Sequence, residues 1–181
     1  FRAPDFDPSQ VEDLLVTRSG GREELWIATF GRGLVRLTDA GITAWTLESG
    51  DLRSNLVYRL KATSLPGGER VVWAATRNGL VRIHGDEAQL FDRRHGLPSD
   101  VIRNLHVWRS PSGVDVLWIA TDGGVARTVT GGSSWQIASL LGASSIGVFG
   151  VLVEPDGKGG ERLWVASTQD GLGLYEDGRW R

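Results

Sequence analysis

A five-residue segment recurs four times in this 181-residue chain and constrains its fold more than any other feature. Each copy reads aliphatic-Trp-x-Ala-Thr, with Ser in place of Thr in the last copy, and the tryptophans are Trp26, Trp73, Trp118 and Trp164. They are separated by 47, 45 and 46 residues. A glycine followed by an aliphatic residue comes next in every copy, at Gly33, Gly79, Gly124 and Gly171. Agreement of this kind in four copies indicates a repeat protein.

Each repeat has the pattern of four short strands. An alternating run, such as 101–107, is followed by a Gly/Pro/Ser turn and then by the tryptophan segment, which is rich in residues that favour strands. A tight glycine turn leads to a third run, because such turns need a positive φ. We expect the fourth run to carry an aromatic residue in every repeat: Trp45, Phe91, Trp135 and Trp180. No stretch keeps a period of 3.6 residues, so no helix is expected.

Four antiparallel strands in about 40–45 residues are typical of one blade of a β-propeller. We therefore predict an all-β β-propeller with four four-stranded antiparallel blades: blade 1 about 11–47, blade 2 about 56–91, blade 3 about 101–138 and blade 4 about 147–181, which is truncated. A β-sandwich is the alternative, but it gives no reason for near-identical units. Within each blade, the tryptophan and the alanine two residues later share a face. We expect each indole to pack between neighbouring blades.

The two ends of the sequence predict a longer array. Phe1 precedes Val11 by the same interval that separates Phe91 from Val101, so residues 1–10 are interpreted as the tail of a preceding blade and an inter-blade loop. We therefore expect other propeller blades, or a second copy of this chain, to cover the outer edges of the four blades.

The composition narrows the class of function. Twenty Lys and Arg residues against twenty-two Asp and Glu residues give a net charge of −2, which argues against a nucleic-acid partner. No apolar run approaches the roughly eighteen residues of a membrane span, so a membrane enters only through flanking segments. The absence of cysteine excludes disulfides, thiolate zinc sites and a cysteine nucleophile.

The sequence offers little support for catalysis. Its three histidines, His84, His95 and His106, fall on different predicted elements and have no metal-ligand spacing. His95, Ser99 and Asp100 lie too close in one loop to form a catalytic triad. We therefore predict no catalytic residue, no metal and no cofactor.

Ligand binding is the more plausible activity, and the repeat indicates where to look for it. Residues present in every blade serve the blade, so the four repeated tryptophans, and the arginines Arg36, Arg82 and Arg127, are interpreted as structural contacts. A ligand site should use positions at which the blades differ, which lie in the loops between strands two and three and between successive blades. In a propeller these loops emerge on one face. The candidate ligand-binding residues are Arg32, Arg53, Asn55, Arg77, Asn78, Arg93, Arg94, His95, Asp122, Gln169 and Asp170. The guanidinium, amide and carboxylate groups of these residues suit a hydroxyl-rich or anionic ligand.

The run 96–102, Gly-Leu-Pro-Ser-Asp-Val-Ile, followed by 117–127, Leu-Trp-Ile-Ala-Thr-Asp-Gly-Gly-Val-Ala-Arg, resembles the two-component regulator propeller repeat. The fourth repeat departs most from this pattern, with Leu174 in place of the arginine. The resemblance implies seven-bladed propellers in the periplasmic, or extracytoplasmic, sensor region of bacterial hybrid histidine kinases or diguanylate cyclases. It also implies a non-catalytic module for signal transduction that binds a small molecule or oligosaccharide.

Two other functions stay open at this point. One is a passive protein-interaction scaffold that uses the propeller rim. Streptogramin lyases are also seven-bladed propellers, which use histidine with a magnesium ion, and His95 is the residue that would act as the base in such an enzyme.

Overall fold

The four repeats fold as four separate sheets. The structure is a computed structural model that describes residues 10–65, 67–138, 147–158, 160–169, 171–177 and 179–181. Each repeat forms one antiparallel four-stranded sheet whose strands lie in chain order. The all-β prediction of four four-stranded blades is therefore confirmed, and the sandwich alternative does not apply. The expected tail at 1–10 lies almost entirely outside the described residues.

The strands have the following bounds. Blade 1 contains β1 (Val11–Ser19), β2 (Arg22–Thr29), β3 (Leu34–Thr38) and β4 (Gly41–Trp45). Blade 2 contains β5 (Val57–Ser64), β6 (Arg70–Thr76), β7 (Gly79–His84) and β8 (Glu87–Phe91). Blade 3 contains β9 (Ile102–Arg109), β10 (Asp115–Thr121), β11 (Gly124–Thr128) and β12 (Gln136–Ala138). Blade 4 contains β13 (Val148–Pro155), β14 (Glu161–Ser167), β15 (Gly171–Glu176) and β16 (Arg179–Trp180).

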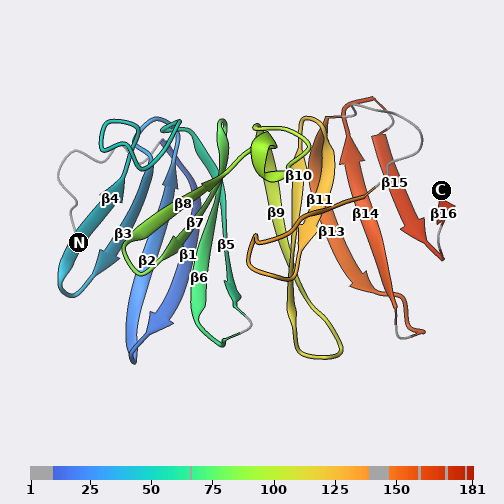
Figure 1. The fold of residues 1–181 in the computed structure, drawn as a ribbon, viewed down its shortest axis with the longest axis horizontal. Helices are drawn as coiled ribbons and strands as arrows, with labels where there is room; N and C mark the ends of the chain where they lie inside the picture. The colour runs from blue at the N-terminus through green and yellow to red at the C-terminus, as the bar shows by residue number, and fades with distance from the viewer. Residues whose placement is uncertain (1–9, 66, 139–146, 159, 170, 178) are drawn as a thin grey trace.

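The blades stand side by side in chain order, with blades 1 and 4 at opposite ends of a fan (Figure 1). The first strand of each blade packs next to the first strand of the following blade, so β1, β5, β9 and β13 form the seams. A short 3-10 turn, η2 (Arg93–His95), lies between blades 2 and 3, where the sequence predicted no helix.

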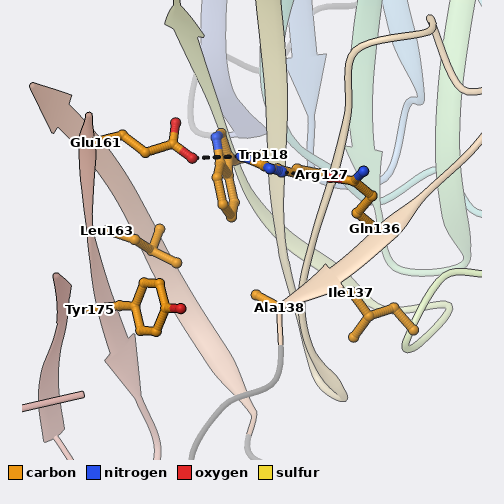
Figure 2. A pocket seen from close by; sticks show the side chains of 8 residues that line it. All are labelled: Trp118, Arg127, Gln136, Ile137, Ala138, Glu161, Leu163 and Tyr175. Atoms are coloured by element: carbon orange, nitrogen blue, oxygen red, sulfur yellow. Dashed lines mark hydrogen bonds and ion pairs between the residues drawn. The ribbon is translucent and has the colours of Figure 1, made fainter. Parts of the chain in front are cut away.

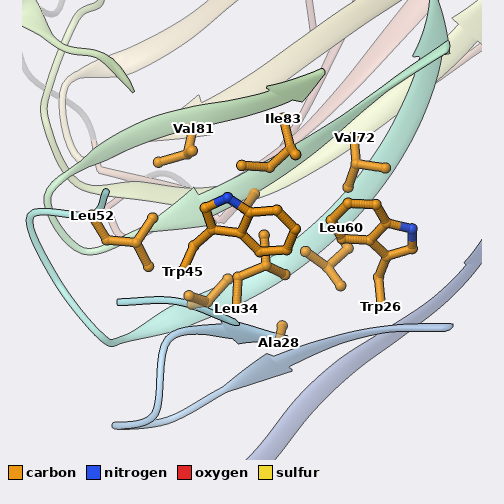
Figure 3. Packing of buried hydrophobic residues seen from close by; sticks show 11 residues of the cluster. Trp26, Ala28, Leu34, Trp45, Leu52, Leu60, Val72, Val81 and Ile83 are labelled. Atoms are coloured by element: carbon orange, nitrogen blue, oxygen red, sulfur yellow. The ribbon is translucent and has the colours of Figure 1, made fainter. Parts of the chain in front are cut away.

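Three of the four repeated tryptophans lie in the seams, as expected. Trp26 and Ala28 of blade 1 pack in one cluster with Leu60 and Val72 of blade 2 (Figure 3). Trp73 and Trp118 occupy the same place in the next two seams, and all three indoles are buried. Trp164 is half-buried, on the flank of blade 4 that faces away from blade 3.

The arginine on the third strand connects each blade to the next. Arg36 reaches the carbonyl of Gly85 at 3.1 Å and the carboxylate of Asp86 at 2.5 Å, both in the β7–β8 turn of blade 2. Arg82 donates in the same way to the carbonyl of Gly131 in blade 3, and Arg127 to Glu161 of blade 4 at 2.5 Å. Each guanidinium also lies over the tryptophan of its own blade, at 5.1 to 5.9 Å from the ring centroid.

The threonine and glycine of the repeat build the turn between the second and third strands. Thr76 Oγ1 donates to the Gly79 carbonyl at 2.7 Å and accepts from the Asn78 N–H at 3.1 Å. Gly79 has a φ of +108°, and a Cβ there would lie 2.6 Å from Leu90 Cδ1. Only glycine fits this backbone without strain. Thr121 and Gly124 repeat the arrangement in blade 3.

One expectation about the fourth strands is wrong. In the strand register Trp45 pairs with Leu34 and Phe91 pairs with Leu80, but the equivalent Val125 pairs with Ala138. Trp135, expected in this position, precedes β12 instead. Its ring packs against Trp73 and Phe91 of blade 2, with centroid distances of 6.3 and 5.8 Å. In blade 4, Trp180 pairs with Tyr175 rather than with the equivalent residue, Leu172.

Candidate functional site

The loops chosen as the candidate site do lie on one face. The turn between the second and third strands bonds through its backbone to residues that enter a blade, which is the next blade for the turns of blades 1 and 2 and the same blade for the turn of blade 3. Gly31 N–H donates to the Asn55 carbonyl at 2.9 Å, and Gly79 N–H donates to the Asp100 carbonyl at 2.6 Å. Asp122 N–H donates to the Val101 carbonyl at 3.1 Å. We call this side of the blades the loop face.

A buried carboxylate that the sequence analysis did not single out organises the centre of the loop face. Asp92 is 3% exposed and accepts from Arg53 Nη1 at 2.8 Å and from the Arg94 N–H at 2.9 Å. It also pairs with His95 Nδ1 at 2.8 Å and caps the 3-10 turn η2. Burial alone raises the pKa of Asp92, but the bonds from His95, Arg53 and Arg94 outweigh it and lower that pKa below its ordinary value. Asp92 is therefore an ionised structural anchor.

Two further candidates are held by partners on the same face. Asn55 donates through Nδ2 to both carboxylate oxygens of Glu48, at 3.0 and 2.9 Å. Asp122 receives a bidentate pair from Arg103, at 2.6 and 2.8 Å. The bond to Asp122 raises the pKa of Arg103. These pairs shape the loops and leave fewer groups for a ligand.

The remaining cations on the loop face extend into solvent. Within the described residues, no hydrogen bond or ion pair engages the side chains of Arg32, Arg77, Arg93 and Arg94, all of which are exposed. Asn78 Nδ2 approaches the Arg53 carbonyl at 3.5 Å, and Gln169 is exposed. Asp170 lies outside the described residues. The unpaired cations are thus four guanidiniums on the β2–β3, β6–β7 and β8–β9 loops, which suit anionic or hydroxyl-rich ligands.

The structure gives His95 a local role. Its Nδ1 contacts Asp92, its ring lies edge-on to Phe91 at a centroid distance of 5.7 Å, and its backbone belongs to η2. No group of three or more potential metal ligands occurs in the part of the chain that the structure describes. No helix within those residues is long and apolar enough to cross a membrane.

Two cavities lie between blades rather than among the candidate loop residues. One, of about 310 Å³, lies between blades 1 and 2. The other, of about 290 Å³, lies between blades 3 and 4 (Figure 2). Its lining residues are Trp118, Arg127, Gln136, Ile137, Ala138, Glu161, Leu163 and Tyr175. The sequence analysis missed this cavity, because it placed Trp135 in the fourth strand and only the strand register shows Ala138 at that position.

Several solved structures share this arrangement of sheets. BBS1N, in its complex with ARL6DN, matches with a TM-score of 0.70 and 15% identity, over 95% of this chain and 55% of that one. The extracellular domain of a protein from B. thetaiotaomicron described as a hybrid two-component system matches with a TM-score of 0.62 and 15% identity, over 100% of this chain and 25% of that one. Virginiamycin B lyase from Staphylococcus aureus matches with a TM-score of 0.58 and 18% identity, over 100% and 56%.

These likenesses define a class of fold. The chain has an all-β, propeller-like architecture of four antiparallel four-stranded sheets, and it spans between a quarter and just over half of the length of these structures. No protein-family model and no curated protein sequence matches it.

Proposed function

We propose that this chain is a non-catalytic ligand-sensing propeller module from the extracytoplasmic region of a bacterial signalling receptor. The repeat pattern resembles the two-component regulator propeller repeat, and the fold resembles extracellular domains of proteins described as hybrid two-component and one-component systems. The ligand is a small molecule or oligosaccharide with acidic or hydroxyl groups, bound on the loop face.

The observation that supports this proposal is the division of charged groups on the loop face. Asp92 and Asp122, the carboxylates that would repel an anion, are each neutralised by arginine. Arg77, in the β6–β7 turn, and Arg94, in the same loop as Asp92, have exposed side chains with no partner among the described residues. Loops 77–78 and 92–101 carry the arginines Arg77, Arg93 and Arg94 against the carboxylates Asp92 and Asp100, so their formal charge is positive, although the chain as a whole is slightly acidic.

Signalling requires that the ligand bind one arrangement of blades more tightly than another. The loops that carry Arg77 and Arg94 lie at the seam between blades 2 and 3. Asp100, at the entry of blade 3, accepts hydrogen bonds from the backbone N–H groups of both loops. A ligand that bridges these loops biases the packing of blades 2 and 3. We further propose that the chain belongs to a larger propeller, in which other blades or a second copy cover the outer flanks of blades 1 and 4.

The test is calorimetric titration with a panel of acidic and neutral oligosaccharides and small anions, with and without magnesium. The sensor function predicts saturable, metal-independent binding that is lost in Arg77→Ala and Arg94→Ala. Arg22→Ala is the matched control, because Arg22 is an exposed arginine at the start of β2, on the opposite edge of blade 1.

Each other outcome of this titration selects a different function. Magnesium-dependent turnover of a ligand, abolished in His95→Gln, identifies a propeller lyase. Absence of both binding and turnover across the panel supports the interaction scaffold and contradicts the sensor. Binding that persists in both arginine variants contradicts the loop-face site.

A further inference from the structure

Each blade carries an extra residue near the start of its first strand. In blade 1 the strand register steps by one residue between Val11 and Asp13, and the same step recurs in β5, β9 and β13. A β-bulge of this kind turns a side chain out of the ordinary alternation of the strand. The four extra residues, which we call the bulge row, are Glu12, Tyr58, Arg103 and Phe149.

The bulge row lies at the loop-face end of the inner strands. In every blade the bulge is opposite the end of the second strand, at Thr29, Thr76, Thr121 and Ser167, directly before the turn to the third strand. The first strands of successive blades lie next to one another, so the bulge row follows the inner side of the fan. Bulges in proteins are often found next to binding sites, where they redirect a side chain.

The position of the bulge is repeated, but its residue type is not. The four blades place a carboxylate, a tyrosine ring, a guanidinium and a phenyl ring there, whereas the tryptophan of the second strand is the same in all four. The fold therefore needs the bulge in the backbone and does not need any one side chain on it. Variable side chains on a repeated frame are the expected feature of a ligand site.

Members of the bulge row from blades 2, 3 and 4 lie close together. The Arg103 guanidinium lies over the Phe149 ring, at 5.7 Å from its centroid, and Phe149 is 50% exposed. The hydrogen bond to Asp122 is the main cause of the raised pKa of Arg103, and Tyr58 of the preceding blade adds to it. Tyr58 therefore lies within electrostatic range of the guanidinium. Aromatic surface and a charged pair thus border each other at the inner side of the loop face.

The charged pair offers a donor and an acceptor side by side. Arg103 donates to Asp122 through Nε at 2.6 Å and through Nη2 at 2.8 Å, and its Nη1 has no partner among the described residues. The two side chains are 35% and 36% exposed, so both reach solvent. A carboxylate oxygen can accept more than one hydrogen bond, so Asp122 can still accept from a ligand.

We propose that the bulge row and Asp122 bind the ring of a neutral sugar residue. The C–H surface of the sugar ring packs on the part of Phe149 that Arg103 leaves uncovered. Neighbouring hydroxyl groups of the sugar accept from Arg103 Nη1 and donate to Asp122, since a hydroxyl group does both. Because the bulge row is part of the loop face, this site rests on the proposed function and assigns the hydroxylated ring of the ligand to it.

The pairing of Arg103 selects hydroxyl groups over other ligand groups. Asp122 already neutralises Arg103, so the pair offers no net positive charge to an anion. A purely apolar ring would cover the pair without replacing its hydrogen bonds to water, which is unfavourable. A ring that carries neighbouring hydroxyl groups contacts the aromatic surface and satisfies both members of the pair.

The test titrates the 181-residue protein with D-glucose, D-galactose and D-mannose, and follows binding by calorimetry and NMR. We expect at least one hexose to bind saturably with a millimolar or lower dissociation constant. Phe149→Ala should weaken that hexose at least about fivefold, because it removes the aromatic surface. Phe30→Ala is the matched control, since it removes a ring of the loop face that is 49% exposed and lies outside the bulge row. Absence of hexose binding at millimolar concentration, or equal weakening in the two variants, would overturn the proposal.

Asp122→Asn distinguishes a hydroxyl site from an anion site. It keeps the shape of the side chain and removes its charge, so it should weaken the hexose about tenfold and leave succinate binding no weaker. Unchanged hexose binding together with stronger succinate binding would contradict the hydroxyl contact.

The same titrations separate failure of this site from failure of the proposed function. Succinate binding that is lost in Arg77→Ala and kept in Phe149→Ala, with no hexose bound, would overturn the sugar site and leave the loop-face sensor in place. Hexose binding that is lost in Phe149→Ala and kept in Arg77→Ala supports the sugar site and contradicts the arginine contacts of the proposed function.

Discussion

At the scale of single residues, one histidine makes a seam sensitive to pH. His106 on β9 contacts the Val153 carbonyl of β13 through Nε2 at 3.1 Å and is half-buried. Burial lowers the pKa of His106, and the positive charge of Lys61 lowers it further, while the bond to Val153 opposes these effects without cancelling them. The folded protein therefore favours the neutral imidazole.

This shift of the His106 pKa predicts that mild acid weakens the fold. The unfolded chain takes up the His106 proton near pH 6.5, whereas the folded chain takes it up at lower pH. The free energy of unfolding should be highest above about pH 6.5 and should fall as the pH decreases toward the folded pKa. Chemical denaturation at a series of pH values between neutral and mildly acid measures this slope.

His106→Gln should flatten that slope, and exposed His84→Gln should preserve it. Because the pKa of Asp92 is lowered, its contribution to the free energy of unfolding is lost only at about pH 4 or below. It therefore does not affect the comparison of the two histidine variants. An unchanged slope in His106→Gln would show that this histidine does not control the acid response.

At the scale of secondary-structure elements, the third strand of each blade supplies the joint to the next blade. Arg82 on β7 combines a bond to the Gly131 carbonyl, a bond to Gln89 and contact with the rings of Trp73 and Phe91. Burial lowers the pKa of Arg82. The side chain thus binds two blades through polar and aromatic contacts at once.

Arg82→Ala should therefore lower the free energy of unfolding by about 2 kcal/mol, since it removes charge-assisted hydrogen bonds and cation–π contact and leaves the Gly131 carbonyl unpaired. Arg77→Ala, five residues earlier and exposed, should change it by less than about 0.5 kcal/mol. Urea denaturation of both variants measures the difference. Equal effects would mean that the repeated arginine does not hold the seam.

The sequence predicts the elements better than it predicts the contacts between them. The alternating pattern and the repeated Trp-x-Ala-Thr segment identify the strands and the seams, because the period of two and the burial of one face act within a single repeat. Trp135 escapes this reasoning, because its place depends on a loop. A Cβ on Gly132 would lie 2.6 Å from Phe91 Cζ, so this glycine lets the loop pack on blade 2 and carries Trp135 there. The cavity at Ala138 results from that shift of register.

The candidate site was predictable only in outline. The assignment of two loop sets to one face follows from strand order, and the backbone bonds between loops agree with it. Which polar side chains are free was not predictable, because Arg53 and Asp122 are paired with residues distant in the chain or on another element, and the pairing of Asn55 with Glu48 depends on how their shared loop folds. No sequence feature marks Asp92, and only its burial and its hydrogen bonds show that it anchors the loop.

At the scale of the whole molecule, both ends of the fan expose apolar side chains. Leu14 and Val16 on β1 are 58% and 59% exposed, and Leu172 on β15 is 68% exposed. In the seams, the equivalent faces are covered by a neighbouring blade. Contiguous exposed apolar faces of this kind are typical of interaction surfaces.

We expect the chain to associate through these flanks as its concentration rises, which sedimentation velocity detects as a growing apparent mass. Val16→Glu and Leu172→Glu place a charge on each flank and should each hold the chain as a monomer. Val129→Glu, at an exposed position after β11, should associate like the wild type. A monomeric wild type at every concentration would contradict the proposal that a second copy covers the flanks.

The arginine contacts between successive blades all run in the same direction along the chain. Each repeated arginine extends toward the blade that follows it in the chain. The acceptors in blades 2 and 3 lie between the third and fourth strands of those blades. In blade 1 that turn contains Asp39, which is exposed, while blade 4 carries Leu174 where the others carry arginine. Two copies can thus continue the array only head to tail, with blade 4 of one copy against blade 1 of the next. Their junction would lack the arginine contact that stabilises each seam within the chain. Such a junction should dissociate and re-form far more readily than the seams within one chain.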